Sequence, residues 1–282
     1  MDELNDIVIV GAGPAGLTAG LFTGRAMLRT VIIEKQNFGG ELMNREMIGN
    51  YPSYPNGVLG PELGSRMMEQ ATKYGVEFAF GDVRGIRIEK DRKIVITGDG
   101  EYAGKAVILA GGSRPKKLGV PGEEQFQNKG VFYYATCDGP RFANKVMAVA
   151  GGGDSGLTEA LQLARYVTKA IILECQPRLT ATKIVQQKVS SDPKIEIKCG
   201  FRIDAICGRS GVESLNVTDM NSGKKSLLEA GGVLVHVGIE PNTDYLKGMV
   251  PLNERGQVIV NDKMESESEG FFAAGDIRQN SA

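Results

Sequence analysis

Metal-ligating and redox-active side chains are scarce in this sequence of 282 residues, which has one histidine and four cysteines. The cysteines are scattered, with neither a C-x-x-C pair nor the spacing of a metal site, at Cys137, Cys175, Cys199 and Cys207. The histidine, His236, lies inside the apolar run 233–237, where we expect a strand residue rather than a catalytic base. We therefore expect no bound metal, and the cysteine usage is typical of a reducing, cytoplasmic compartment.

An excess of one charge and long hydrophobic runs are also absent. With 33 basic and 34 acidic residues the net charge is −1, so no basic excess favours nucleic acid or an anionic membrane surface. No apolar stretch reaches the ~18 residues of a membrane helix candidate, and the first six residues are too acidic for a signal peptide. The length suffices for two domains of ordinary size. From the charge and the hydropathy we expect no nucleic-acid or membrane partner.

Glycine is abundant, with 38 residues, and it marks a motif that occurs twice. In the first copy the apolar run 7–10 leads into the hexapeptide 11–16 (GAGPAG), and Glu34 follows Gly11 by 23 positions. In the second copy the run 147–150 leads into the hexapeptide 151–156 (GGGDSG), and Glu174 follows Gly151 by the same 23 positions. A strand, a G-x-G-x-x-G turn, a helix and an acid ~20 residues on are typical of a dinucleotide-binding βαβ unit. Two copies predict two bound dinucleotides.

The residue types of each copy fit this role. The first glycine permits a tight turn, the second lets the backbone approach a pyrophosphate, and the third lets helix and strand pack closely. The helix N-terminus adds free N–H groups and the positive end of the helix dipole, and the acid accepts a hydrogen bond from a ribose 2′-OH. The residues expected to hold the first dinucleotide are Gly11, Gly13, Pro14, Ala15, Gly16 and Glu34. Those expected to hold the second are Gly151, Gly153, Asp154, Ser155, Gly156 and Glu174.

The order of the expected elements indicates that one domain is inserted into the other. Residues 84–97 alternate like a β-ribbon, and the run 106–110 is expected to be a buried strand that ends in glycines. Pro115 favours an extended chain, so residues 113–115 are expected to cross between domains. The second domain has an expected helix over 157–166 and a closing strand and turn over 231–242. That helix is expected to bury one face, made of Leu157, Ala160, Leu161 and Ala164.

The segment 270–276 repeats the pattern of a strand followed by glycine, and we expect it to return to the first domain. We therefore predict an α/β fold of two Rossmann-like dinucleotide-binding domains. The first is formed by residues 1–114 and 243–282, and the second, residues 115–242, is inserted into it.

With these residues identified, the chain resembles the low-molecular-weight thioredoxin reductase family of flavoproteins over nearly its whole length. The resemblance rests on the two glycine motifs and on Glu34-Lys35, Gly39-Gly40-Glu41, Gly49–Pro52, Ala135–Gly139, Pro241–Thr243 and Ala273–Asp276. It implies FAD in the first domain, a pyridine nucleotide in the second, a homodimer, and rotation of the two domains about the linkers. For FAD it implies Glu34 on the adenosine ribose and Asp276 on the ribitol. Its other implied FAD residues are Lys35, Gly40, Glu41, Asn50, Val83, Gly111 and Gly275.

The expected redox centre departs from the pattern of the family. The family carries C-A-T-C, whereas the tetrad here is Tyr134-Ala135-Thr136-Cys137. In the family the first cysteine attacks the partner disulfide and the second faces the flavin, so one of the two thiols that disulfide exchange requires is missing. Cys137 and Asp138 are the catalytic candidates. Beside a flavin, Cys137 is either a reactive thiol of lowered pKa or an inert residue.

The second motif also departs from the family. The family's basic cluster for a 2′-phosphate is replaced by Glu174-Cys175-Gln176 and, further on, Thr180. A carboxylate repels a 2′-phosphate and suits a 2′-hydroxyl, so NADH is favoured over NADPH, while ferredoxin or another donor stays open. Family members continue past the Gly-Asp segment with a further helix, and the sequence leaves open whether this chain is complete.

Three functions follow from these observations. The favoured one is an FAD-dependent oxidoreductase that passes electrons from NADH or another donor to an acceptor without a C-x-x-C dithiol. The acceptor is expected to be a small molecule, a quinone or an iron–sulfur protein. The second is a nucleotide-sensing or scaffold flavoprotein with reduced turnover. The third is a thioredoxin reductase that uses Cys175, Cys199 or Cys207 as the missing thiol.

Overall fold

The computed structural model describes residues 4–135, 139–246 and 248–281. Cys137 and Asp138, the expected catalytic residues, therefore lie outside the described residues. The chain divides into two compact units, of which the first holds residues 1–114 and 240–282 and the second holds residues 115–239. The second crossing lies between Ile239 and Glu240, three residues before the expected one.

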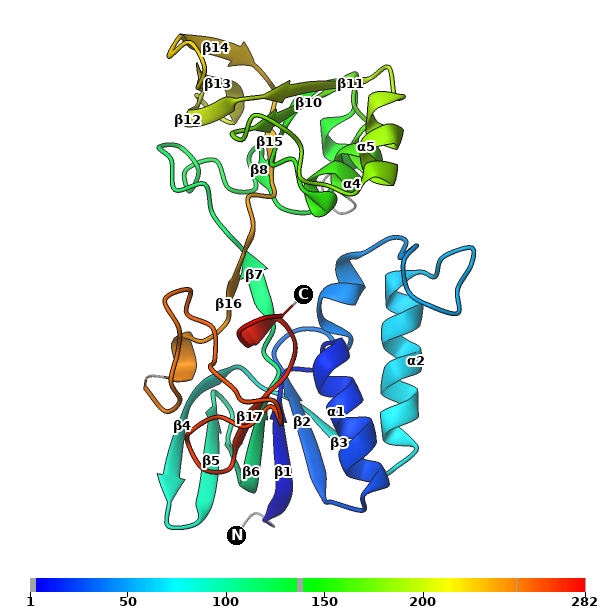
Figure 1. Ribbon diagram of the computed structural model, residues 1–282, viewed down its shortest axis with the longest axis vertical. Coiled ribbons are helices and arrows are strands. Elements are labelled where there is room, and N and C mark those ends of the chain that lie inside the picture. The colour runs from blue at the N-terminus through cyan, green and yellow to red at the C-terminus, as the bar shows by residue number, and fades with distance from the viewer. Residues whose placement is uncertain (1–3, 136–138, 247, 282) are drawn as a thin grey trace. The chain divides into compact units, whose positions relative to one another are not determined.

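The first unit is built on a sheet of order β3-β2-β1-β6-β5-β4, with β17 paired to β6 (Figure 1). Its parallel strands are β1 (Asn5–Val10), β2 (Thr30–Glu34), β3 (Glu77–Phe80), β6 (Glu101–Leu109) and β17 (Phe271–Ala273). The antiparallel ribbon expected at 84–97 is confirmed as β4 (Val83–Glu89) and β5 (Arg92–Thr97). The pairing of β17 with β6 confirms that the C-terminal segment returns to this unit.

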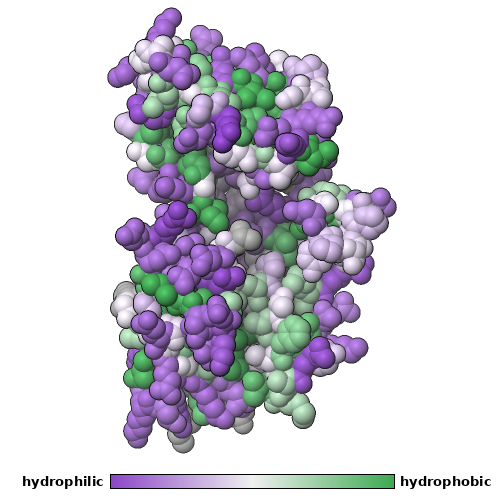
Figure 2. Space-filling model, viewed as in Figure 1, coloured by the Kyte–Doolittle hydropathy of each residue, from purple (hydrophilic) through white to green (hydrophobic). Residues whose placement is uncertain are grey.

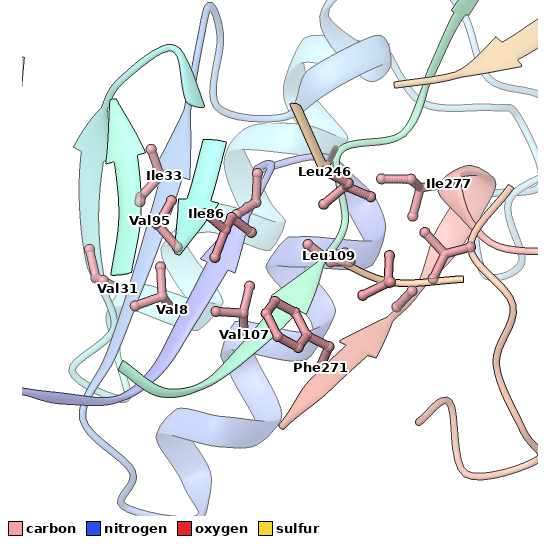
Figure 3. Close-up of a cluster of buried hydrophobic side chains, with 14 residues drawn as sticks. Val8, Val31, Ile33, Ile86, Val95, Val107, Leu109, Leu246, Phe271 and Ile277 are labelled. Atoms are coloured by element: carbon pink, nitrogen blue, oxygen red, sulfur yellow. The ribbon is translucent and has the colours of Figure 1, made fainter. Parts of the chain in front are cut away.

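Helices cover one face of this sheet, namely α1 (Pro14–Arg25) and α2 (Gly60–Thr72). Because successive side chains of a strand point to opposite faces, Ile9 packs toward α1 while Val8 and Val10 pack on the other face. Figure 3 shows that second cluster, in which Val107 and Phe271 from neighbouring strands lie side by side. The described residues of this unit also form short 3-10 helices, namely η1 (Gly40–Asn44), η3 (Asp244–Leu246) and η4 (Gly275–Ile277).

The second unit repeats this plan. Its parallel sheet has the order β11-β10-β9-β15-β8, from β8 (Val131–Phe132), β9 (Val146–Ala150), β10 (Lys169–Glu174), β11 (Ile195–Cys199) and β15 (Val233–Val235). The helices α4 (Asp154–Leu163) and α5 (Lys183–Ser190) pack on one face. On the other face lies an antiparallel sheet that the sequence did not predict, of β12 (Phe201–Gly208), β13 (Val212–Asp219) and β14 (Lys225–Glu229). A 3-10 helix, η2 (Gly139–Phe142), precedes β9.

Two details of this unit differ from the expectation. The helix expected over 157–166 ends at Leu163, and residues 164–166 form a turn. Of the expected face, Leu157, Ala160 and Ala164 are buried, whereas Leu161 is only partly buried and Leu163 takes its place in the core. His236 follows β15 instead of lying in it.

A short ribbon joins the units, in which β7 (Ser113–Pro115) pairs with β16 (Ile239–Pro241). On the face in view, hydrophilic residues cover much of each unit, with apolar residues in smaller patches (Figure 2). Within the residues that the structure describes, no helix is long and apolar enough to cross a membrane.

Candidate dinucleotide sites

The turn after β1 has three glycines in three different environments. Gly11 has φ +101°, in the left-handed region, and a Cβ there would overlap the backbone oxygen of Ala110. A Cβ on Gly16 would overlap the backbone oxygen of Gly11, so the start of α1 lies directly against the turn. A Cβ on Gly13 would meet nothing within 4 Å. The open side of this turn is therefore at Gly13, where a pyrophosphate approaches the backbone in a dinucleotide fold.

The turn after β9 has the same construction. Gly151 has φ +115°, and a Cβ there would overlap the backbone oxygen of His236. A Cβ on Gly156 would overlap the oxygen of Gly151, while the nearest atom to a Cβ on Gly153 is Thr180 Oγ1, at 3.6 Å. The two turns, although far apart in the sequence, thus both leave open space at the second glycine of the motif, Gly13 or Gly153.

Both helices that follow the turns begin without a side-chain cap. Gly13 and Gly153 are the N-cap residues of α1 and α4, with φ −71° and −85°. The first N–H groups of a helix have no partner within the helix, so they point to the place that the open glycine exposes. Pro14 at the first position of α1 removes a donor that the helix does not use.

The two expected carboxylates make matching hydrogen bonds. Ala12 N donates to Glu34 Oε2 at 2.8 Å, and Gln36 N donates to Oε1 at 2.9 Å. Gly152 N donates to Glu174 Oε2 at 2.6 Å, and the N–H of the second residue after Glu174 donates to its Oε1 at 2.8 Å. Each carboxylate is thereby fixed beside its turn before a ligand binds. A carboxylate has about four hydrogen-bond acceptor positions, so both Glu34 and Glu174 can still accept a hydrogen bond from a ribose hydroxyl.

Other expected FAD residues converge on the first turn. Gly40 has φ +55°, and a Cβ there would lie 2.8 Å from Gly13 Cα. Gly275 has φ +79°, and a Cβ there would lie 2.8 Å from Ala15 Cβ. The Cα of Gly111 lies 3.0 Å from where a Cβ on Gly11 would be. Asp276 follows in η4. The positive φ and the close approach explain why glycine occupies positions 40 and 275, whereas a Cβ on Gly111 would meet no atom closer than 3.4 Å.

Most of the remaining expected residues are exposed. Lys35 is exposed, with its Nζ 3.2 Å from Asp82 Oδ1. Val83 opens β4, and Asn50 is exposed in the loop between η1 and α2. In the first turn of α4, Ser155 is exposed and Asp154 Oδ1 accepts hydrogen bonds from the N–H and hydroxyl of Thr182, at 3.1 and 2.7 Å. In η1, Glu41 Oε2 accepts a hydrogen bond from Asn44 Nδ2 at 3.5 Å.

Three polar residues near the sites were missed in the sequence. Glu159 of α4 is 1% exposed, and its Oε2 accepts the N–H of Ala135 at 2.6 Å, directly before the segment 136–138. Ser113 donates a hydrogen bond to Asp276 Oδ2 at 3.2 Å. The Tyr245 hydroxyl is buried near Gly111, without a hydrogen-bond partner among the described residues. Its burial raises its pKa, so it stays an O–H donor. None stands in a motif, and only the fold brings them to the sites.

The described cysteines are free thiols in the second unit. Burial, and next the neighbouring Glu174, raise the pKa of both Cys175 and Cys199. Cys175 also donates a hydrogen bond from Sγ to Glu174 Oε1 at 3.4 Å. Cys207 lies in β12. In the described ranges no three His, Cys, Asp or Glu side chains are grouped so that they could hold a metal ion.

Known proteins share this construction. The family model for pyridine nucleotide-disulphide oxidoreductases matches residues 5–282. The thioredoxin reductase of Bacillus subtilis (strain 168) is 38% identical over 281 residues, covering 99% of this chain and 89% of the relative. The crystal structure of Lactococcus lactis thioredoxin reductase superposes with a TM-score of 0.96 at 36% identity, covering 99% of this chain and 92% of that one. That of T. acidophilum thioredoxin reductase gives 0.94 at 30% identity, with the same coverage.

The chain therefore belongs to the pyridine nucleotide-disulphide oxidoreductases and, within them, to the low-molecular-weight thioredoxin reductase family. This confirms the predicted α/β fold of two Rossmann-like units and the prediction of an oxidoreductase. The family uses FAD together with a nicotinamide cofactor.

Proposed function

We propose that this chain is an FAD-dependent oxidoreductase that takes electrons from NADH, in preference to NADPH, and passes them to an acceptor without a C-x-x-C dithiol. The observation that carries the proposal is the pair of matching cradles, each with an open glycine, an uncapped helix start and a fixed carboxylate. When bound, FAD supplies the redox chemistry, and the protein supplies binding, orientation and electrostatics.

The first unit is proposed to hold FAD, within residues 1–114 and 243–282. The N–H groups at the start of α1 bind the pyrophosphate beside Gly13, Glu34 accepts the adenosine ribose hydroxyl, and Asp276 accepts a ribitol hydroxyl. The fit is supported by the open side of Gly13 and by the close approach of Gly40 and Gly275 to the same turn. The supporting residues are Gly11, Pro14, Ala15, Gly16, Lys35, Glu41, Asn50, Val83 and Gly111.

The second unit is proposed to hold the nicotinamide dinucleotide, within residues 115–242. The start of α4 binds its pyrophosphate, and Glu174 accepts the ribose 2′-hydroxyl. Glu174 is 8% exposed and both of its oxygens are fixed by N–H groups, so it cannot easily turn away from a 2′-phosphate. A fixed carboxylate at this place repels a second negative charge, which supports the preference for NADH.

The tetrad with Tyr134 in place of a first cysteine supports an acceptor other than a protein disulfide. The acceptor is proposed to be a small molecule, a quinone or an iron–sulfur protein, with Cys137 and Asp138 nearest the reaction. The raised pKa values of Cys175 and Cys199 disfavour a thiolate and so weigh against either as a replacement nucleophile. The protein is further proposed to be a homodimer, in keeping with its family. It is proposed to work in the reducing cytoplasm, in keeping with the free thiols of the described cysteines.

Anaerobic titration of the purified protein tests this proposal. We expect NADH to bleach the visible flavin spectrum at a lower concentration than NADPH, and heat to release FAD rather than FMN. An unchanged spectrum with both nucleotides would exclude a nicotinamide donor. Turnover of ferricyanide or dichlorophenolindophenol with NADH then separates the enzyme from a nucleotide-sensing flavoprotein, for which the rate stays below that of free FAD.

A further inference from the structure

Residues 111–114, at the end of the first stretch of the first unit, make several polar contacts with other residues of that unit. Asn242 Nδ2 donates to the oxygen of Gly111 at 2.9 Å. Arg114 Nε donates to Glu240 at 2.7 Å, and its Nη1 donates to Asp244 at 2.6 Å. All of these residues belong to the first unit. The peptide between Gly111 and Arg114, which carries Ser113, is therefore anchored on both sides.

Ser113 connects this anchored segment with Asp276. Its hydroxyl donates to Asp276 Oδ2 at 3.2 Å. The described residues give the Asp276 carboxylate no other side-chain or backbone donor, so Oδ1 and part of Oδ2 stay available to a ligand. Asp276 itself lies in the turn that packs Gly275 against Ala15, so its backbone is fixed while its side chain is exposed.

We propose that Ser113 is a positioning residue for the flavin, holding the Asp276 carboxylate in the rotamer that receives a ribitol hydroxyl. The inference rests on the proposed role of Asp276 in FAD binding and adds a residue that no sequence motif marks. An unrestrained aspartate loses rotamer freedom when a ligand binds, which weakens binding. The hydrogen bond from the Ser113 hydroxyl restricts the Asp276 side chain before FAD binds, so that part of this entropic cost is no longer paid on binding. Ser113 is also the first residue of β7, so the flavin site is joined to the ribbon between the units.

The test measures the Kd of FAD for each holoprotein, from the flavin fluorescence released on serial dilution. We expect Ser113→Ala to raise the Kd about 3- to 10-fold, the range of one net hydrogen bond. Ser113→Thr, which keeps the hydroxyl, should stay within about twofold of the wild type. Asp276→Ala should weaken binding by a larger factor than Ser113→Ala, and adding Ser113→Ala to it should change the Kd no further, because the two residues act through one contact.

Two controls separate a positioning role from a structural one. The urea midpoint of flavin-free Ser113→Ala protein should match the wild type, since the contact is exposed. An unchanged Kd in Ser113→Ala, a lack of rescue by Ser113→Thr, or an equal effect in the Asp276→Ala background would each overturn the proposal. A wild type that retains no FAD would instead refute the proposed function, and normal FAD binding by Asp276→Ala would refute the role of Asp276.

Discussion

The two glycines that flank Pro14 and Ala15 should respond to the same substitution in opposite ways. Gly13→Ala places a methyl group in open space, at a residue whose φ of −71° suits alanine. The free energy of unfolding of the flavin-free protein should change by less than about 1 kcal/mol, the scale of an N-cap effect. The methyl group would occupy the place proposed for the pyrophosphate of FAD. Loss of one or two charge-assisted hydrogen bonds of about 1.5–3 kcal/mol each should then weaken FAD binding at least tenfold.

Gly16→Ala should mainly disturb folding. Its Cβ would overlap the backbone oxygen of Gly11, which cannot move without displacing the turn. Overpacking of this kind costs about 1–3 kcal/mol, and the gain from alanine in a helix offsets about 1 kcal/mol at most. Because the overlapped atom is backbone and not the end of a flexible side chain, the cost should lie in the upper part of that range, about 2–3 kcal/mol. We therefore expect a net loss of about 1–2 kcal/mol in the free energy of unfolding.

Urea unfolding followed by circular dichroism, together with FAD titration, measures both effects. Gly100→Ala is the matched control, because a Cβ there also meets nothing within 4 Å but Gly100 lies in the turn between β5 and β6, outside the proposed site. It should change neither quantity. Wild-type FAD affinity in Gly13→Ala would refute the assignment of the open side to a pyrophosphate, and wild-type stability in Gly16→Ala would refute the packing argument.

Three further outcomes are expected. Gly153→Ala should weaken NADH binding at least tenfold with little loss of stability, whereas Gly156→Ala should lower the urea midpoint, because only the second Cβ meets backbone; equal midpoints would contradict this. Glu174→Gln removes the charge but keeps the size, so the ratio of kcat/KM for NADPH over NADH should rise about tenfold in steady-state reduction of ferricyanide. An unchanged ratio would exclude charge as the cause. Tyr134→Cys restores a C-x-x-C pair and should create NADH-dependent insulin reduction with thioredoxin; absence of any gain would count against the proposed position of Cys137 beside the flavin.

The elements that the sequence predicted are those that carry a strong local signal. The apolar runs before Gly11 and Gly151 become β1 and β9, because consecutive buried residues between parallel neighbours, Val8–Val10 in β1 and Met147–Ala150 in β9, need no polar face. The strand at 271–273 was found because its short apolar run leads into a glycine, as the runs of the two motifs do. The glycines were found because φ above +100° at Gly11 and Gly151 restricts the residue type.

The sheet of β12, β13 and β14 escaped prediction because its outer strand is mostly exposed and its residues alternate only weakly. Lys225 and Ser226 are exposed, and Leu227 is 62% exposed. The pairing of β7 with β16 also leaves no local sign, since it joins strands of three residues more than a hundred positions apart. Long-range pairings of this kind depend on the surrounding fold rather than on propensity.

The same contrast holds within the sites. The residues proposed to contact a dinucleotide in both copies occupy positions set by backbone geometry, so the spacing of the glycines and the acid identifies them. The polar contacts that lie outside the motifs, Ser113 with Asp276 and Glu159 with the N–H of Ala135, join segments that only meet after folding. The two cradles differ in the burial of their carboxylates, since Glu174 is buried and Glu34 is only partly buried, so the choice of nicotinamide donor should be sought in the environment of Glu174.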